Sequence, residues 1–101
     1  MHDASINAFG SEMSVIVHIP YIFHHLTGGI KTIRTKSQNT GGCLHELVER
    51  FPSIKSRLFD EQGQLKKYVE LYMNNNKIDN RLDFPMRDED ELRIYVVILG
   101  G

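Results

Sequence analysis

Residues 14–35 read SVIVHIPYIFHHLTGGIKTIRT and predict a β-hairpin. From Val15 to Tyr21 the side chains alternate between two faces, and one face is wholly apolar, which is the pattern of a half-buried strand. Thr27-Gly28-Gly29 is typical of a turn. Ile30 to Thr35 contains residues that favour extended backbone. We expect two strands joined by a long loop that holds the solvated pair His24-His25.

A helix is expected next, over residues 40–51. Asn39 or Thr40 can cap its first turn, because a side-chain oxygen there accepts from a backbone N–H that the helix leaves unpaired. An apolar stripe at helical spacing follows, formed by Leu44, Leu47, Val48 and Phe51. Pro52 ends the helix, and residues 53–59 are expected to form a short helical turn.

Two further strands come from the C-terminal half. Residues 68–73 and 92–96 each place apolar side chains on one face. Asn74-Asn75-Asn76 predicts a turn, since asparagine tolerates left-handed backbone. A weak additional strand fits between this turn and Pro85, which itself excludes a central strand.

This order of elements predicts an α+β domain over residues 13–101. One helix with one apolar stripe and strands with one apolar face pack most simply as a mixed sheet of four to five strands, with the main helix across one face. The first and last strands are then parallel neighbours, which is the β-grasp (ubiquitin-like) fold. Residues 1–12 show no clear period and precede Met13, so we expect a disordered leader or an expression remnant.

Composition excludes several classes of function. A net charge of -1 gives no electrostatic case for binding nucleic acid or an anionic membrane. No apolar run approaches the roughly 20 residues of a membrane span. Cys43 is the single cysteine, so an internal disulfide is excluded, which fits a reducing compartment. The default expectation is a cytoplasmic protein.

The sequence ends in Gly100-Gly101, directly after the apolar last strand. A random chain ends this way about once in 200, and two glycines weaken local structure rather than support it. A flexible tail that threads a narrow enzyme channel would, however, gain from the absence of Cβ atoms near its carboxylate. The alternative is a frayed end of no consequence.

Nothing else in the sequence indicates an active site. The five histidines lack the spacing of a zinc site, so we expect no metal and no bound cofactor. Cys43 lies in the first turn of the expected helix, where a thiol can be reactive, but it has no neighbouring base and is better interpreted as a small packing residue. Asp88 to Glu91 are expected to form a solvated acidic turn.

The solvent face of the predicted sheet carries aromatic side chains. By alternation it holds Ile16, His18, Tyr68, Tyr72, Tyr95 and Val97. Exposed apolar groups gathered in this way often mark a partner surface. Ordinary strand-forming residues, or burial by the leader, would give the same pattern.

These features together resemble the MoaD/ThiS family. The resemblance spans about residues 14–101 and rests on the order of its motifs: Val15-Ile16-Val17-His18-Ile19-Pro20, Thr27-Gly28-Gly29, the helix with Leu44, Leu47 and Val48, Tyr68-Val69-Glu70-Leu71-Tyr72-Met73-Asn74, the turn at 88–92 and the final Gly-Gly. Ile-Pro followed by a Thr-Gly-Gly loop most resembles the sulfur carriers of cysteine biosynthesis.

The resemblance implies a carrier rather than an enzyme. A partner of the E1-like MoeB/ThiF type would use ATP to adenylate the carboxylate of Gly101, beside Gly100, and sulfur would then replace AMP to give a thiocarboxylate. A client enzyme would take the sulfur: a pyridoxal-phosphate-dependent cysteine synthase in the cysteine branch, and other enzymes in the molybdopterin and thiamin branches. The partners would contact Tyr95, Val97, Ile98, Leu99, Tyr68 and Tyr72.

Two rival functions remain open on the sequence. One is a ubiquitin-like modifier joined to lysines through Gly101, and the other is a non-covalent β-grasp interaction domain with an inert tail. The segment Tyr95-Val96-Val97-Ile98-Leu99 is also bulkier than in relatives, which often carry proline and small residues there. This difference from relatives affects the assignment of the client enzyme more than it affects the predicted role as a carrier.

Overall fold

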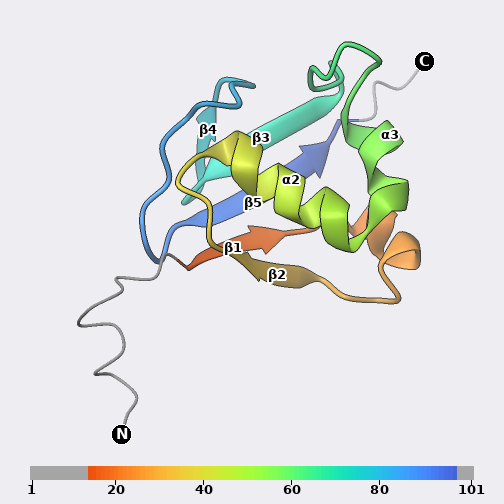
Figure 1. Ribbon diagram of the computed structural model, residues 1–101, viewed down its shortest axis with the longest axis horizontal. Coiled ribbons are helices and arrows are strands. Elements are labelled where there is room, and N and C mark those ends of the chain that lie inside the picture. The colour runs from red at the N-terminus through yellow and green to blue at the C-terminus, as the bar shows by residue number, and fades with distance from the viewer. Residues whose placement is uncertain (1–13, 98–101) are drawn as a thin grey trace, which may run out of the picture.

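The computed structural model describes residues 14–97 as one mixed five-stranded sheet with helices on one face (Figure 1). The strand order is β2-β1-β5-β3-β4. The strands are β1 (Val15–His18), β2 (Thr32–Thr35), β3 (Val69–Met73), β4 (Asn76–Ile78) and β5 (Glu91–Val96), and the main helix is α2 (Thr40–Arg50). The predicted β-grasp fold is confirmed.

The sheet is centred on a parallel pair. β1 and β5 run side by side with Ile16 opposite Glu91 and Val17 opposite Leu92, while β5 pairs antiparallel with β3 on its other side. The alternation of apolar residues sets this register, because a shift of one residue would turn every buried side chain to solvent. The predicted parallel contact between the first and last strands is therefore confirmed.

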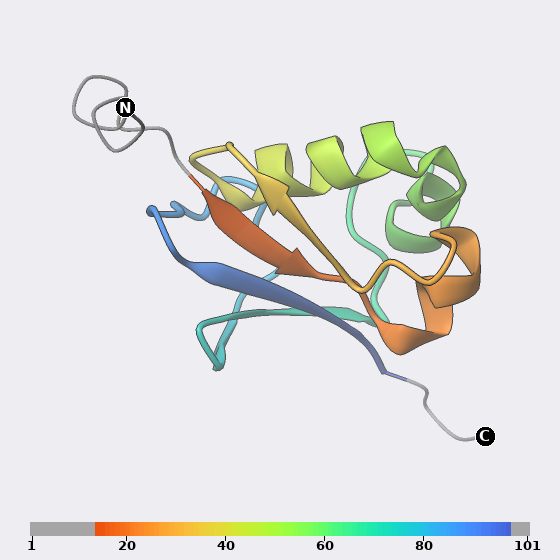
Figure 2. The ribbon, with the colours of Figure 1, turned by 90° about the horizontal axis from the view of Figure 1, so that it is seen from below.

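Helix α2 covers one face of the sheet (Figure 2). Its N-cap is Asn39, whose Oδ1 accepts from the backbone N–H of Gly42 at 2.7 Å. Leu44 and Leu47 are fully buried in the core, and the other predicted members of the stripe, Val48 and Phe51, are partly buried. The expected helical turn after Pro52 is present as η2 (Pro52–Ile54) and α3 (Lys55–Leu58).

The segment between the first two strands differs from the prediction. β1 ends at His18, and the expected loop is a 3₁₀ helix, η1 (Tyr21–Leu26), that follows Pro20. This helix places Phe23 in the core and leaves Tyr21 on the surface. Burial of one aromatic ring here outweighs the extended preference of the flanking residues.

The weak additional strand of the prediction is β4. It pairs antiparallel with β3 through a tight turn in which Asn74 and Asn75 have φ of 49° and 74°. Asparagine is among the few residues that adopt these left-handed angles readily. Within residues 14–97, no helix is long and apolar enough to cross a membrane.

Candidate functional site: the C-terminal end of β5 and the open sheet face

Strand β5 leads directly to the segment that carries the expected reacting group. The backbone N–H of Val97 donates to the carbonyl of Tyr68 at 2.7 Å, which ties the chain to β3 just beyond the end of β5. Ile98, Leu99, Gly100 and Gly101 lie outside the described residues. The start of the proposed tail is thus fixed at one corner of the sheet (Figure 2).

Two of the predicted docking residues form an aromatic pair on the open sheet face. The rings of Tyr72 and Tyr95 meet edge to face, with centroids 5.0 Å apart and planes at 86°. Tyr95 is 48% exposed, and Val97 is partly buried two residues further on. An edge-to-face pair holds its rings in a defined orientation, so Tyr95 presents a preformed apolar surface near the start of the tail.

Tyr68 has different partners from the other two tyrosines. Its hydroxyl donates to the carbonyl of Arg57 in α3 at 3.0 Å, and the Lys66 ammonium lies 5.9 Å from its ring centroid. Tyr68 therefore links β3 to α3, although it is 37% exposed.

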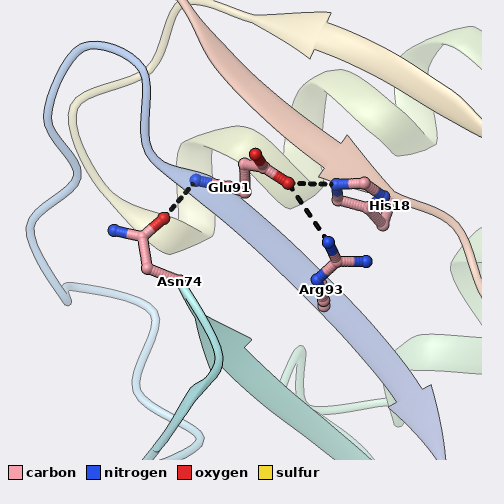
Figure 3. Close-up of polar contacts among 4 residues, drawn as sticks. All are labelled: His18, Asn74, Glu91 and Arg93. Atoms are coloured by element: carbon pink, nitrogen blue, oxygen red, sulfur yellow. Dashed lines mark hydrogen bonds and ion pairs between the residues drawn. The ribbon is translucent and has the colours of Figure 1, made fainter.

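A polar cluster lies on the same open face as Tyr95. The Glu91 carboxylate oxygen Oε1 is 2.7 Å from His18 Nε2 and 3.3 Å from an Arg93 guanidinium nitrogen (Figure 3). The Glu91 backbone N–H also donates to the Asn74 side-chain oxygen at 2.9 Å. Only the apolar, aromatic and histidine members of this face were predicted from the sequence, yet the alternation that places Tyr95 there places Glu91 and Arg93 there too.

A groove of about 610 Å³ adjoins this cluster where β1 and β5 end. Its walls come from η1, from Lys31 and Thr32 at the start of β2, and from residues 93–96 of β5. The lining includes Tyr21, Ile22 and Tyr95. This groove was not predicted from the sequence, because a loop was expected where η1 forms its wall.

Asp88 and Asp90 hold the expected acidic turn together. The Ser14 backbone N–H donates to Asp88 Oδ1 at 2.9 Å, and that of Arg87 donates to Asp90 Oδ2 at 2.7 Å. The Asp88 carboxylate thereby joins the turn before β5 to the start of β1, while that of Asp90 closes the turn itself. The turn lies at the opposite end of β5 from the groove.

Cys43 is fully buried at the start of α2. Burial raises the pKa of its thiol, and the Glu46 carboxylate adds to the rise, while the hydroxyl that Thr35 donates to Sγ at 3.2 Å opposes it. A thiol with a raised pKa is a poor nucleophile at neutral pH. Among residues 14–97, no group of three or more His, Cys, Asp or Glu side chains could hold a metal ion.

His24 and His25 in η1 were both predicted to be solvated, and this holds for only one of them. His25 is exposed, whereas His24 is partly buried and its Nε2 lies 2.9 Å from the carbonyl oxygen of Ile19. His24 thus helps to hold η1 against the end of β1.

Solved structures of small ubiquitin-like proteins resemble this fold closely. A chain of the BexX/CysO complex of Amycolatopsis orientalis is 29% identical, with a TM-score of 0.76 over 86% of this chain and 99% of that one. CysO of Mycobacterium tuberculosis is 27% identical, with a TM-score of 0.73 over 83% and 99%. Small archaeal modifier protein 1 of Haloferax volcanii is 20% identical, with a TM-score of 0.75 over 85% and 99%, a likeness of fold alone.

No family model matches the sequence, and no curated protein matches it. The structural matches nevertheless confirm the resemblance to MoaD/ThiS-type ubiquitin-like sulfur carriers close to CysO. The general kind of function is that of the small ubiquitin-like carriers and modifiers.

Proposed function

We propose that this protein is a sulfur carrier whose C-terminal glycine is adenylated by an E1-like enzyme and then converted to a thiocarboxylate. The observation that supports this most is the likeness to the two CysO-type chains, at 29% and 27% identity over 99% of their length. The sequence Gly100-Gly101 stands where such a function needs it, shortly after the last strand.

The chemistry requires a partner at each step. A free carboxylate is a poor electrophile, so an oxygen of Gly101 attacks the α-phosphorus of ATP on the activating enzyme, and pyrophosphate leaves. A sulfur nucleophile then attacks the acyl carbon of the adenylate, and AMP leaves with the electron pair of the broken C–O bond. The resulting thiocarboxylate is anionic and nucleophilic, so it can pass its sulfur to a client enzyme.

The structure around Val97 is suited to a carrier whose C-terminus must enter the active sites of other enzymes. Val97 is held to β3, so four residues remain beyond it, and an extended chain of that length reaches about 13 Å. A carboxylate on such an arm can enter a second protein's site, where the orientation imposed by that site supplies much of the rate. The open face around Tyr95 would contact the activating enzyme, and Ile98 and Leu99 would line the passage of the tail.

Several partners follow from this proposal. The carrier itself binds no cofactor, and ATP belongs to the activating enzyme of MoeB/ThiF type. The CysO-like resemblance favours a pyridoxal-phosphate-dependent cysteine synthase as the client, in place of a molybdopterin or thiamin enzyme. The reactions take place in the cytoplasm, and neither nucleic acid nor a membrane takes part.

The test is reconstitution with the E1-like enzyme encoded in the same genome, ATP and sulfide. We expect release of pyrophosphate and AMP, and an intact mass that corresponds to exchange of one oxygen for one sulfur. A chain extended by one residue after Gly101 is the matched control and should give neither. Isopeptide-linked adducts on lysines, without the mass change, would instead support the modifier function.

A further inference from the structure

We propose that the outer edge of β2 binds an extended, acidic segment of another protein as an additional strand of the sheet. In the described sheet β2 is the outermost strand on its side, with β1 as its neighbour (Figure 1). Strand β1 separates β2 from β5, the strand that leads to the C-terminal tail. This edge is therefore a site apart from the tail, and the proposal goes beyond the proposed function.

The backbone of β2 directs hydrogen-bonding groups outward at every second residue. The N–H of Ile19 donates to the carbonyl of Lys31 at 2.8 Å, so these two opposed residues form a hydrogen-bonded pair. Such pairs alternate with non-hydrogen-bonded ones along an antiparallel ladder. Ile33 therefore bonds to β1, whereas Thr32 and Arg34 direct their backbone N–H and C=O groups away from the sheet.

Helix α2 closes one end of this edge and leaves the other end open. The Arg50 guanidinium donates to the Arg34 carbonyl at 2.9 Å, and the Lys36 N–H donates to the Glu46 carboxylate at 2.9 Å. Within the part of the chain that the structure describes, the N–H and C=O of Thr32 and the N–H of Arg34 have no hydrogen-bond partner. An added strand could form three backbone hydrogen bonds there.

The side chains along the edge determine the charge of the segment that binds. Residues 31–36 read KTIRTK, which includes three basic residues and no acidic one, although the whole chain has a net charge of -1. All three are exposed, and none forms an ion pair among the described residues; Arg34 contacts the neutral hydroxyl of Ser14. Arg50 adds a fourth cation, and the Glu46 carboxylate offsets one of the four. The remaining positive charge favours an acidic partner.

Charge and backbone together select the occupant. A second copy of the chain, paired through its own β2, would bring like charges together, which destabilises a strand pair. A polyanion such as a nucleic acid matches the charge but lacks the alternating N–H and C=O groups of a strand. An extended acidic peptide satisfies both requirements, since strand addition takes its affinity from main-chain hydrogen bonds.

The opposite edge of the sheet lacks this combination. Strand β4 is only three residues long, against four for β2. The Lys77 ammonium of β4 also lies 3.4 Å from the Glu70 carboxylate, so its charge is already engaged. We therefore assign strand addition to β2.

The test uses the isotope-labelled, full-length chain with capped peptides as probes. The acidic probe is EEVTVTVEE, and KKVTVTVKK is its charge control. The backbone control is the acidic probe with its central valines and threonines N-methylated, which removes the donors of both its edges and keeps its charge. Backbone amide exchange and chemical shifts of the chain locate each peptide and give its Kd.

In the free chain we expect fast amide exchange at Thr32 and Arg34 and slow exchange at Ile33. The acidic probe should slow exchange at Thr32 and Arg34 at concentrations up to about 1 mM, which suits a weak complex. Both control peptides should bind about tenfold more weakly or worse. The Kd should rise with salt, because salt screens the attraction between the charges.

Two variants separate the contributions of charge and backbone. Arg34→Glu reverses a charge on the edge. Thr32→Pro removes an outward donor and keeps the ladder to β1, since proline is tolerated on edge strands where the N–H faces away from the sheet. Each should raise the Kd of the acidic probe about tenfold. Lys55→Glu, exposed on α3, is the charge-matched control and should behave as the native chain does.

Circular dichroism melts show whether each variant folds. If Thr32→Pro does not fold, the N-methylated peptide makes the same comparison from the other side of the contact. Unchanged exchange at Thr32 and Arg34 in about 1 mM acidic probe would overturn the proposal. So would slow exchange at these two amides in the free chain that deletion of residues 1–12 makes fast, because the leader would then be the occupant.

Two further results separate this proposal from the proposed function. A chain without Gly100 and Gly101 should bind the acidic probe as the native chain does, even though it cannot be loaded with sulfur. Arg34→Glu should be activated with the native KM, and a raised KM would assign the edge to the activating enzyme and overturn the proposal. Binding of a heparin fragment as tight as that of the acidic probe, with equal amide exchange in both complexes, would show attraction by charge alone and would also overturn it.

Discussion

Nε2 of His18 lies 2.7 Å from Oε1 of Glu91, across the parallel contact between the first and last strands. Both side chains are partly exposed, at 27% and 41%. The pair lies at the centre of the sheet, where residues 73 positions apart in the sequence meet. It therefore reports on the long-range pairing that defines the fold.

Replacing Glu91 by Gln should change stability only slightly. Exposed and partly exposed ion pairs contribute about 0–1 kcal/mol because solvent screens them, and glutamine retains one acceptor oxygen. We expect the free energy of unfolding in urea to fall by no more than about 1 kcal/mol. A loss larger than about 2 kcal/mol would show that Glu91 is essential to the pairing of β1 with β5.

Truncation of the helix face should have a much larger effect. Leu47 is fully buried between α2 and the sheet, so Leu47→Ala removes apolar contact and leaves a cavity, at a cost of about 2–5 kcal/mol. His45→Ala, on the exposed side of the same helix, is the control and should cost well under 1 kcal/mol. Equal losses for the two variants in urea unfolding would contradict the packing described here.

The strands of the central pair and helix α2 also show how much of the fold could be predicted from the sequence. The buried residues of β1, β5 and α2 follow regular periods, because each faces one continuous core, and the fold follows from those periods. Helix η1 has no such period. It forms because Phe23 is buried after Pro20, a tertiary effect that local preferences do not reveal.

The candidate site was predicted from a terminal motif and from strand alternation, and only part of it could be found in this way. The terminal glycines are a motif, and alternation identified the aromatic members of the open face. The groove and the His18–Glu91–Arg93 cluster depend on which strand ends adjoin one another and on where η1 lies. Those are properties of the assembled sheet, so local sequence patterns could not define them.

The buried thiol of Cys43 gives a prediction on pH. Its pKa is raised in the folded protein, so folding disfavours the thiolate. The folded state then holds its proton above the unfolded pKa of about 8.5, and stability from this group falls as the pH rises through that value. We expect slow alkylation of the native protein at pH 8, rapid alkylation in urea, and a loss of stability above about pH 9 that Cys43→Ala lacks.

Cys43 is also expected to play no part in sulfur transfer. Sulfur should reside on the terminal acyl group, so Cys43→Ser should still be loaded to the native extent once its folding has been verified. Intact mass after reaction with the activating enzyme measures this. Loss of loading in a folded Cys43→Ser variant would identify the thiol as a persulfide relay.

The leader should be dispensable. Residues 1–12 lack apolar periodicity and lie outside the described residues, and β1 begins only at Val15. Deleting them should leave the melting temperature and the rate of adenylation unchanged. A truncated protein without a cooperative melt would show that the leader contributes to the fold.

The strongest prediction concerns the tail. Attack on ATP places the Gly101 carboxylate at the α-phosphorus inside a partner's cleft, and narrow passage to that cleft favours residues without Cβ atoms. Gly101→Ala should therefore slow pyrophosphate release, Gly100→Val should slow it further, and one added residue after Gly101 should abolish it until a protease removes that residue. None should change stability by more than about 0.5 kcal/mol, because chain ends contribute little to the core. The measurement is AMP- and pyrophosphate-linked turnover followed by thiocarboxylate detection by mass. Tyr95→Asp is added as a docking variant, and its control is Ser56→Asp, because Ser56 is exposed on α3 and does not line the groove beside Tyr95. Loss of docking at Tyr95 should raise KM by roughly thirtyfold, the equivalent of about 2 kcal/mol, and leave kcat intact, whereas the tail variants should lower kcat. An extended chain that is loaded with sulfur as fast as the native one would mean that the two glycines are not the reacting end, and the carrier function would have to be abandoned.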